Sequence, residues 1–259
     1  MNDSFKDHAL NLFSTGFHID GRKLDEYREI SYETGISNQS AEGSARVKIG
    51  MTEVVVGIKM EIGEPFPDRL DEGGIIVNAE LKPFSSWKYD SGPPGINAIE
   101  LSRLVDRVIR EGKYLDLKKL CIEEGKRVWI VFIDIYPIND AGNLFDASIL
   151  ASLLALRDAK FPHIKNDRIE YKNLSDESLP LSKKIPLSCT VFICEENIII
   201  DPDSDEENFI DARLTIGITE DNVICALQKG GMTPLTAEEI DKMVDLAMKK
   251  TKELREIIK

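Results

Sequence analysis

Three arginine residues recur at helical spacing in this chain, where their side chains could bind the phosphates of a nucleic acid. They are Arg103, Arg107 and Arg110, in a segment (97–112) whose apolar positions follow the i, i+3, i+4, i+7 pattern of a helix. One helical turn rises about 5.4 Å, so guanidinium groups at this spacing can reach successive phosphates of one strand. This helix face is therefore a candidate nucleic-acid contact.

The same face has a second interpretation, in which the arginines only pair with acidic neighbours on a solvated helix. Acidic residues stand three or four positions from each arginine, and they are Glu100, Asp106 and Glu111. Each such pair stabilises a helix by roughly 0.2–0.5 kcal/mol, about what the like-charged pair Arg103 and Arg107 takes away. The local energetics of the helix do not decide between the two interpretations.

The turn Asp140-Ala-Gly142-Asn143-Leu144-Phe145 is the second place where chemistry would be expected. It joins an apolar run (127–136) that predicts a strand to an apolar run (145–156) that predicts a buried helix. A strand, a turn and a helix N-terminus suit phosphate, because unpaired N–H groups point at the anion. Yet this turn has one glycine and no Arg, Lys, Ser or Thr, and Asp146 follows it, expected to complement the helix dipole. We therefore predict no catalytic residue in this chain.

The sequence also predicts no metal site and no cofactor. The histidines His8, His18 and His163 have no companion ligands at metal spacing, and the four cysteines match no zinc pattern. The acidic run Asp201-Pro-Asp-Ser-Asp-Glu-Glu207 lacks the spacing of a calcium loop. We expect this run to form a solvated turn, and a bound cation is the alternative.

Charge and composition limit the partners that this chain could have. Of its 259 residues, 42% are hydrophobic, and the formal net charge is −13. The sequence shows no apolar run of membrane-spanning length and no apolar signal-peptide core, so we expect a soluble, cytoplasmic protein without a membrane partner. A polyanion is repelled by an evenly spread negative charge. Any nucleic-acid contact therefore needs a local basic patch or a more basic partner subunit.

Apolar periodicity predicts an α/β protein of the α+β kind, in which two units of strands and helices pack together. We divide the chain into an N-terminal helix in residues 1–18, a first unit in residues 19–165 and a C-terminal unit in residues 185–259. The polar stretch 162–180 is the expected boundary or surface excursion.

Within these units, strands and helices follow one another in a fixed order. The first unit is expected to contain strand 30–33, a hairpin over 44–60 that turns at Gly50, and strand 74–81, all ahead of the arginine-bearing helix. In the C-terminal unit, strands are expected at 187–194, 198–200, 213–218 and 223–228. A long helix then starts at Thr236, which forms a capping box with Glu239.

Taken in order, several short motifs resemble the ribonuclease PH family, which includes phosphorolytic exoribonucleases. They are Ile19-Asp-Gly-Arg22, the hairpin 43–60, Asn78-Ala-Glu80, Ile99-Glu-Leu-Ser-Arg-Leu-Val-Asp-Arg107 and Asp201-Pro202. The resemblance runs from Ile19 to the C-terminus and implies the ribonuclease PH fold. Further motifs are most similar to the non-catalytic ring subunits of the archaeal exosome, and they are Glu64-Pro-Phe-Pro-Asp68, 74–80, 91–94 and 129–134.

The resemblance also implies that the catalytic machinery of the family is missing. Catalytic members hold phosphate with a Gly-Gly-Thr-Arg type loop, use an arginine pair before the helix that here begins near Ile99, and carry a catalytic carboxylate in the second unit. The matching positions in this chain are 142–145, Ile96 with Asn97, and Arg213. Without positive charge at the site, a dianionic phosphate cannot be held against a polyanionic chain.

From this resemblance we expect a non-catalytic ring subunit of an exosome that degrades RNA from 3′ to 5′. The implied partners are a catalytic ribonuclease PH-fold subunit, alternating with it in a hetero-hexameric ring, RNA-binding cap subunits and single-stranded RNA. The implied RNA-binding residues are Arg103 and Arg107. Two alternatives remain: the chain is itself a phosphate-dependent exoribonuclease that uses Asp201, Asp211 or another carboxylate, or it is a scaffold that never touches RNA.

Overall fold

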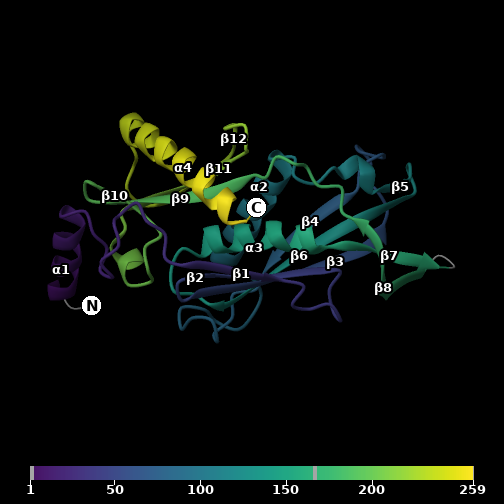
Figure 1. Ribbon diagram of the computed structural model, residues 1–259, viewed down its shortest axis with the longest axis horizontal. Helices are drawn as coiled ribbons and strands as arrows, with labels where there is room; N and C mark the ends of the chain where they lie inside the picture. The colour runs from purple at the N-terminus through teal and green to yellow at the C-terminus, as the bar shows by residue number, and fades with distance from the viewer. Residues whose placement is uncertain (1–2, 166–167, 259) are drawn as a thin grey trace.

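A mixed β-sheet forms one layer of the molecule, whose computed structural model describes residues 3–165 and 168–258 (Figure 1). Within those residues the sheet has six strands in the order β1-β2-β3-β6-β4, with β5 paired to β6. The strands are β1 Ile30–Thr34, β2 Gly43–Ile49, β3 Thr52–Gly63, β4 Gly74–Ala79, β5 Cys121–Glu123 and β6 Arg127–Asn139. The hairpin predicted to turn at Gly50 is confirmed, since β2 and β3 pair around this glycine, whose φ is +54°.

Strand β6 pairs with three other strands of this sheet and is longer than the sequence suggested. It pairs antiparallel with β3 and parallel with β4. The prediction that the strand ends and a turn begins at Pro137 is wrong. Pro137 still pairs with Val54, next to an irregularity in the register. Proline is tolerated at such irregularities, where no ladder N–H is needed. The strand therefore carries the chain three residues further, to Asn139, before it turns.

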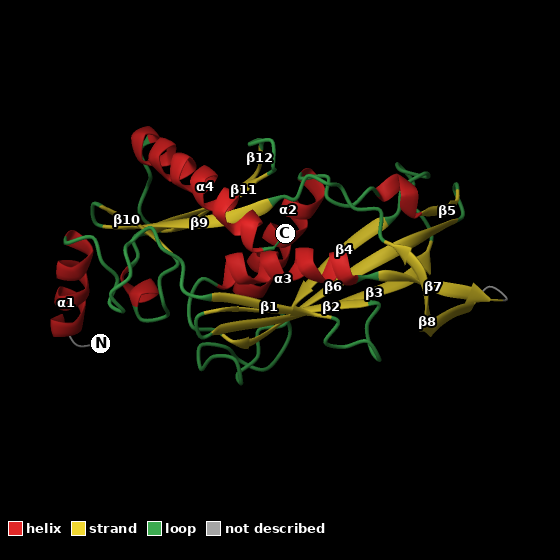
Figure 2. Cartoon of the chain, in the orientation of Figure 1, coloured by secondary structure: helices red, strands yellow, loops and turns green. Residues whose placement is uncertain are grey.

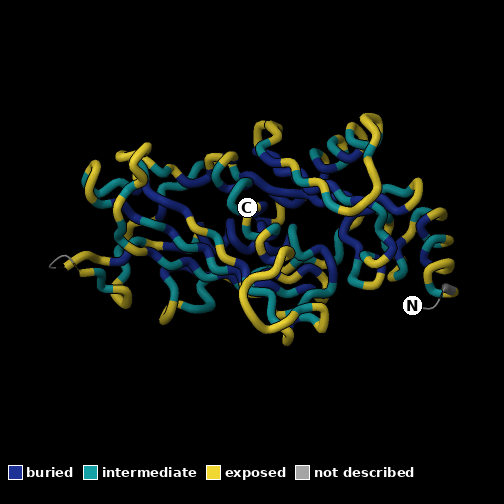
Figure 3. Tube along the Cα trace, turned by 180° about the vertical axis from the view of Figure 1, so that it is seen from behind, coloured by how far each residue is buried: buried dark blue, intermediate teal, exposed yellow. Residues whose placement is uncertain are grey.

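Helix α3 (Leu144–Asp158) lies between the two sheets of the molecule and is buried, as predicted from its apolar sequence (Figure 2). It packs on β2 and β3 from one side and on β9 (Leu187–Cys194) from the other. Small side chains allow this close approach, and Ala147, Ala151 and Ala155 are fully buried. The buried segments therefore run through the middle of the molecule, with exposed loops around them (Figure 3).

The second sheet is antiparallel, with the order β10-β9-β11-β12, and helix α4 (Ala237–Ile257) covers β9 and β11. Its other strands are β10 Asn197–Ile200, β11 Ala212–Ile218 and β12 Ile224–Gly231. The capping box predicted at the start of α4 is confirmed, because Thr236 and Glu239 bond each other's backbone N–H groups. Every residue of β9 is buried, since helices cover both of its faces.

The remaining helices lie around these layers. Helix α2 (Ile96–Glu111) packs against β4, α3 and β12, and it buries the predicted apolar stripe. Helix α1 (Asp3–Ser14) buries Ala9 and Phe13 beside the end of the second sheet. Short 3-10 turns are η1 (Leu117–Leu120) and η2 (Glu206–Phe209). The division into residues 1–18, 19–165 and 185–259 stays a prediction, and residues 1–2 and 259 lie outside the described part.

The stretch 162–180, predicted to be a boundary or surface excursion, contains most of a two-stranded hairpin. Strands β7 (Lys160–Lys165) and β8 (Arg168–Ser178) pair antiparallel, and residues 166–167 lie outside the described residues. Phe161 anchors the hairpin on Trp129, with ring centroids 5.7 Å apart, and Lys59 lies over the ring of Tyr171. These strands were not predicted from the sequence, because the segment is polar and few apolar side chains hold the hairpin to the sheet.

Across the described residues, no helix combines the length and the apolar character that crossing a bilayer requires.

The packing of α3 predicts a large cost for a cavity at its centre. Leu153 is 1% exposed, so Leu153→Ala should lower the free energy of unfolding by about 2–5 kcal/mol. Leu70→Ala is the matched control, because Leu70 is 46% exposed and should cost less than about 0.5 kcal/mol. Denaturant titration of both variants measures the difference. Equal midpoints would contradict the buried position of α3.

Candidate nucleic-acid interface

The turn between β6 and α3 is held by Arg28, from the segment just before β1. Arg28 donates from Nη1 to the Ala141 carbonyl at 2.7 Å and from Nη2 to the Gly142 carbonyl at 3.0 Å. Gly142 has φ +96°, and an added Cβ would lie 2.4 Å from the Pro202 carbonyl oxygen. The turn is therefore fixed against the segment after β10, and only glycine fits this position.

The chain's own Glu207 occupies the N-terminus of α3, where a bound anion would lie. The Asn143 N–H donates to Glu207 Oε1 at 2.8 Å, while the Asn143 side chain makes no helix cap. Burial raises the pKa of Glu207 to about 7, partly offset by this hydrogen bond and supported by the nearby charge of Asp140. An N–H group that could hold a phosphate is thus already bonded to an internal carboxylate.

Asp146, in the first turn of α3, joins this helix to β9 of the second sheet and to Tyr27. Its carboxylate accepts hydrogen bonds from Tyr27 Oη at 2.9 Å, Ser188 Oγ at 2.9 Å, and Thr190 N and Oγ1 at 3.0 and 2.9 Å. The side chain is buried, and burial raises its pKa. The prediction that Asp146 simply complements the helix dipole was therefore too simple. Its partners lie in other elements, which the local sequence could not reveal.

The acidic run 201–207 is partly buried: Asp201 and Glu206 are buried, while Asp205 is exposed, so the expected solvated turn is wrong for the first two. Asp201 is fully buried and accepts from Arg28 Nε and Nη2 at 2.9 and 2.8 Å and from Asn143 Nδ2 at 2.9 Å. Glu206 accepts from the Ile19 N–H at 2.8 Å and lies 2.9 Å from His18 Nδ1. Buried carboxylates persist when such partners compensate for lost water. Among the residues described, no group of His, Cys, Asp or Glu could hold a metal ion.

Arg213, at the position where the resemblance implies a catalytic carboxylate, is bound within the protein. Its Nη2 donates to Glu100 Oε2 at 2.8 Å, and its guanidinium lies 4.2 Å from the centre of the Phe145 ring. These residues line a cavity of about 190 Å³ together with Leu81, Lys88, Tyr89, Asn97, Leu101, Asp140, Leu144 and Glu207. The alternative carboxylates Asp201 and Asp211 do not line it, and Asp211 accepts from the Glu195 N–H instead.

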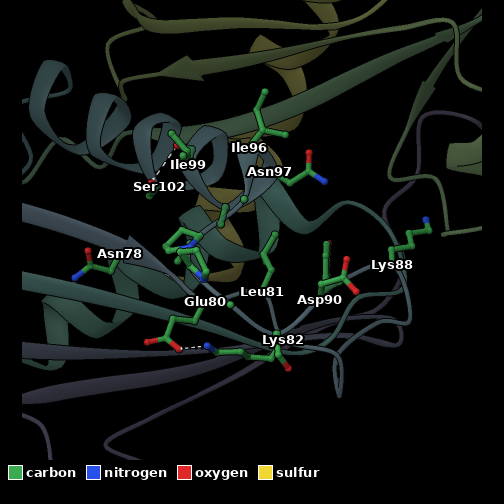
Figure 4. Close-up of a pocket in the computed structure, with 18 of the residues that line it drawn as sticks. Asn78, Glu80, Leu81, Lys82, Lys88, Asp90, Ile96, Asn97, Ile99 and Ser102 are labelled. Atoms are coloured by element: carbon green, nitrogen blue, oxygen red, sulfur yellow. Dashed lines mark hydrogen bonds and ion pairs between the residues drawn. The ribbon is translucent and has the colours of Figure 1, made fainter.

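A larger cavity of about 730 Å³ lies at the N-terminus of α2 (Figure 4). The end of β4, the loop 88–95 and the first turns of α2 line it. Where the resemblance implies an arginine pair, Ile96 and Asn97 supply no positive charge. Lys82, on the cavity wall, pairs with Glu80 at 2.9 Å. Lys88, also on the wall, is exposed and has no ion-pair partner among the described residues. The cavity thus offers one unpaired lysine and not the clustered positive charge that a phosphate site needs.

The three arginines of α2 differ in what they contact. Arg110 pairs with Asp106 at 2.7 Å and donates to the Ile75 carbonyl, so its role is structural. Arg107 is partly buried and donates from Nη1 to the Leu227 carbonyl and to Gln228 Oε1, both at 3.2 Å.

Arg103 is exposed, and in the described part of the chain it makes no hydrogen bond or ion pair. The self-paired interpretation of the arginines is thus confirmed only for the Asp106 pair. Glu100 pairs with Arg213 rather than with Arg103, and no Glu111 bond to Arg107 forms. Sequence reasoning missed Gln228, because β12 lies more than a hundred residues further along the chain.

Both units of the chain match models of one family. Residues 26–162 match domain 1 and residues 184–250 match domain 2 of the 3′ exoribonuclease family, the RNase PH domains. The chain therefore belongs to this family, and the fold predicted from the sequence resemblance is confirmed.

Within the family, the chain is similar over nearly its whole length to archaeal exosome components. It is 44% identical over 250 residues to "Exosome complex component Rrp42" of Methanothermobacter thermautotrophicus, covering 96% of this chain and 92% of the relative. The protein of the same name from Methanocella arvoryzae is 45% identical, covering 97% of this chain and 94% of the relative. These matches confirm the predicted resemblance to archaeal exosome subunits.

Solved structures agree with the sequence matches. A chain of the "archaeoglobus fulgidus exosome with RNA bound to the active site" superposes with a TM-score of 0.92 at 43% identity, covering 99% of this chain and 98% of that one. A chain of an "Archaeal exosome core" gives a TM-score of 0.86 at 41% identity, covering 98% and 96%.

The raised pKa of Glu207 predicts how stability depends on pH. Its ordinary value is 4.5, so this group stabilises the fold fully below about pH 4.5 and loses that contribution as the pH rises through 7. Between pH 5 and pH 8 the wild type should lose about 2–3 kcal/mol of unfolding free energy through this group, and Glu207→Gln should not show this loss. Urea titrations across this range measure it, with exposed Glu196→Gln as the control. Parallel profiles for Glu207→Gln and wild type would contradict the prediction.

Proposed function

We propose that this chain is a non-catalytic ring subunit of an exosome that degrades RNA from its 3′ end. In this proposal it alternates with a catalytic subunit of the same fold, structures that partner's active site, and contributes Arg103 and Arg107 to binding of single-stranded RNA. The names of its relatives and the RNA-bound exosome with which it superposes support this assignment. RNA-binding cap subunits and a cytoplasmic location belong to the same proposal.

The observation that carries the non-catalytic role is the carboxylate of Glu207 at the start of α3. A phosphorolytic site must hold a dianionic nucleophile beside an RNA phosphate, which requires preorganised positive charge. Here the Asn143 N–H bonds Glu207, and the carbonyls of the turn bond Arg28. A phosphate at this place would have to displace the Glu207 side chain from its hydrogen bond with the Asn143 N–H.

The second unit supplies no catalytic acid to the same place. Arg213 lies over Phe145 and bonds Glu100, while Asp201 is fully enclosed by its own partners. General acid catalysis needs a carboxyl group within hydrogen-bond reach of the leaving oxygen. The alternative that this chain is itself an exoribonuclease therefore receives no support from its geometry.

The RNA contact rests on α2, which presents the two arginines. Arg103 is exposed and free of internal partners among the described residues, and Arg107 keeps most of its five N–H donors unused. The net charge of −13 opposes RNA binding by the subunit alone. We therefore assign these side chains to an RNA path whose positive field comes mainly from the catalytic partner. A scaffold without RNA contact is the remaining alternative.

The division of labour predicts that activity appears only in the complex. Incubated alone with RNA and inorganic phosphate, this subunit should release no nucleoside diphosphate, and adding the catalytic partner should start release. Thin-layer or liquid chromatography of the products measures it. A catalytically inactivated partner is the control, because the ring should then assemble without activity. Diphosphate release by the isolated subunit would establish the enzyme alternative.

The RNA contact predicts a change in the salt dependence of binding. In the reconstituted ring, replacing both Arg103 and Arg107 by Ala should weaken RNA binding and make the plot of log affinity against log salt shallower. Two lost contacts to a single strand reduce the slope by about 1.4. Lys119→Ala with Lys126→Ala is the matched control, since it removes two exposed positive charges outside α2. Unchanged affinity and slope in the arginine variant would favour the scaffold.

A further inference from the structure

A series of side-chain contacts connects the start of α3 to Arg107. It begins at Phe145, whose ring lies beneath the Arg213 guanidinium, and continues through the Arg213–Glu100 ion pair. The second Glu100 oxygen accepts from Gln228 Nε2 at 3.2 Å, and Gln228 Oε1 accepts from Arg107 Nη1 at 3.2 Å. These residues come from α3, β11, α2 and β12, so the contacts depend on the packing of both units.

Glu100 determines which way the Gln228 amide faces. A carboxylate accepts hydrogen bonds only, so it selects the NH₂ group of the amide. The amide oxygen then points toward Arg107, which can only donate. With Arg213 bonding the other Glu100 oxygen, the carboxylate has a defined position. From Arg213 to Arg107, each hydrogen bond in this series therefore joins a donor to an acceptor.

Arg107 is held at one nitrogen and free at the others. Its Nη1 donates to Gln228 and to the Leu227 carbonyl, and no bond from Nε or Nη2 forms to any described residue. A guanidinium held in this way loses less rotamer freedom when it binds a phosphate, and it retains the paired donors that suit phosphate oxygens. Arg103, one turn earlier, has no such support.

We propose that Gln228 is a positioning residue that directs the Arg107 guanidinium toward RNA, and that Glu100 and Arg213 fix the amide of Gln228 for this task. The inference rests on the proposed function, because it assigns a role to side chains behind the RNA contact. It gives Arg213 a use at the position where the family resemblance implies a catalytic carboxylate. The residues around the lost catalytic position thus support RNA binding in the ring.

A double-mutant cycle in the reconstituted ring tests this proposal. Gln228→Met keeps the length of the side chain and removes both hydrogen bonds. It should raise the dissociation constant for single-stranded RNA by about threefold to tenfold, the effect of one net hydrogen bond. In an Arg107→Ala background the same substitution should have no further effect. In an Arg103→Ala background it should keep its full effect, which makes this variant the matched control.

The salt dependence separates positioning from a general loss of structure. Gln228→Met leaves the net charge unchanged, yet it should reduce the salt slope toward that of Arg107→Ala, since the phosphate contact is weakened. Arg213→Met should change affinity in the same direction, and Arg213→Lys should recover part of it by restoring the charge beside Glu100. Thermal unfolding of each ring serves as the check on folding.

The outcomes distinguish this inference from the proposed function. If Arg107→Ala weakens RNA binding but Gln228→Met does not, the positioning role is wrong and the RNA contact stands. A Gln228→Met effect that persists fully without Arg107 also overturns the positioning role. If Arg107→Ala itself leaves RNA affinity and salt slope unchanged, the RNA contact of the proposed function fails, and the positioning role fails with it.

Discussion

The buried ion pair between Arg28 and Asp201 is the interaction on which the rest of the site depends. Arg28 binds both oxygens of Asp201, and the same guanidinium bonds two carbonyls of the turn before α3. Each buried charge is costly alone and is tolerated because the other is present. Together they bring the turn at Gly142 against the segment after β10. That segment carries Glu207, so this ion pair helps to position the Glu207 side chain that bonds the Asn143 N–H at the start of α3.

Electrostatic balance explains how an acidic chain can belong to a family that handles RNA. In the described residues, Asp201, Glu206 and Glu207 face inward and bond to arginine, histidine or backbone N–H groups. The positions where the family resemblance implies phosphate-binding groups, 142–145, Ile96 and Asn97, carry no positive charge. Among the described residues, Arg103 on α2 and Lys88 beside the cavities are exposed cations without an internal partner.

The sequence predicted the elements far better than the site. Periodicity located α3, the Gly50 hairpin and the capping box at Thr236, because each follows from neighbouring residues. It also showed that the turn 140–145 lacks anion-binding side chains. It could not show Asp146 between the sheets or the order of contacts from Arg213 to Arg107. Those contacts join residues up to 128 positions apart, which are brought together by the packing of the two units.

The four hydrogen bonds of Asp146 have a consequence for how the molecule loses its structure. They tie the first turn of α3 to β9 and to Tyr27, so separating the sheets would leave a buried carboxylate and several donors without partners. Partial opening between the two halves is therefore disfavoured, and the chain should melt as one cooperative block. For a subunit of a ring, such all-or-none unfolding keeps partly unfolded states rare, and these are the states that proteases cleave and that aggregate.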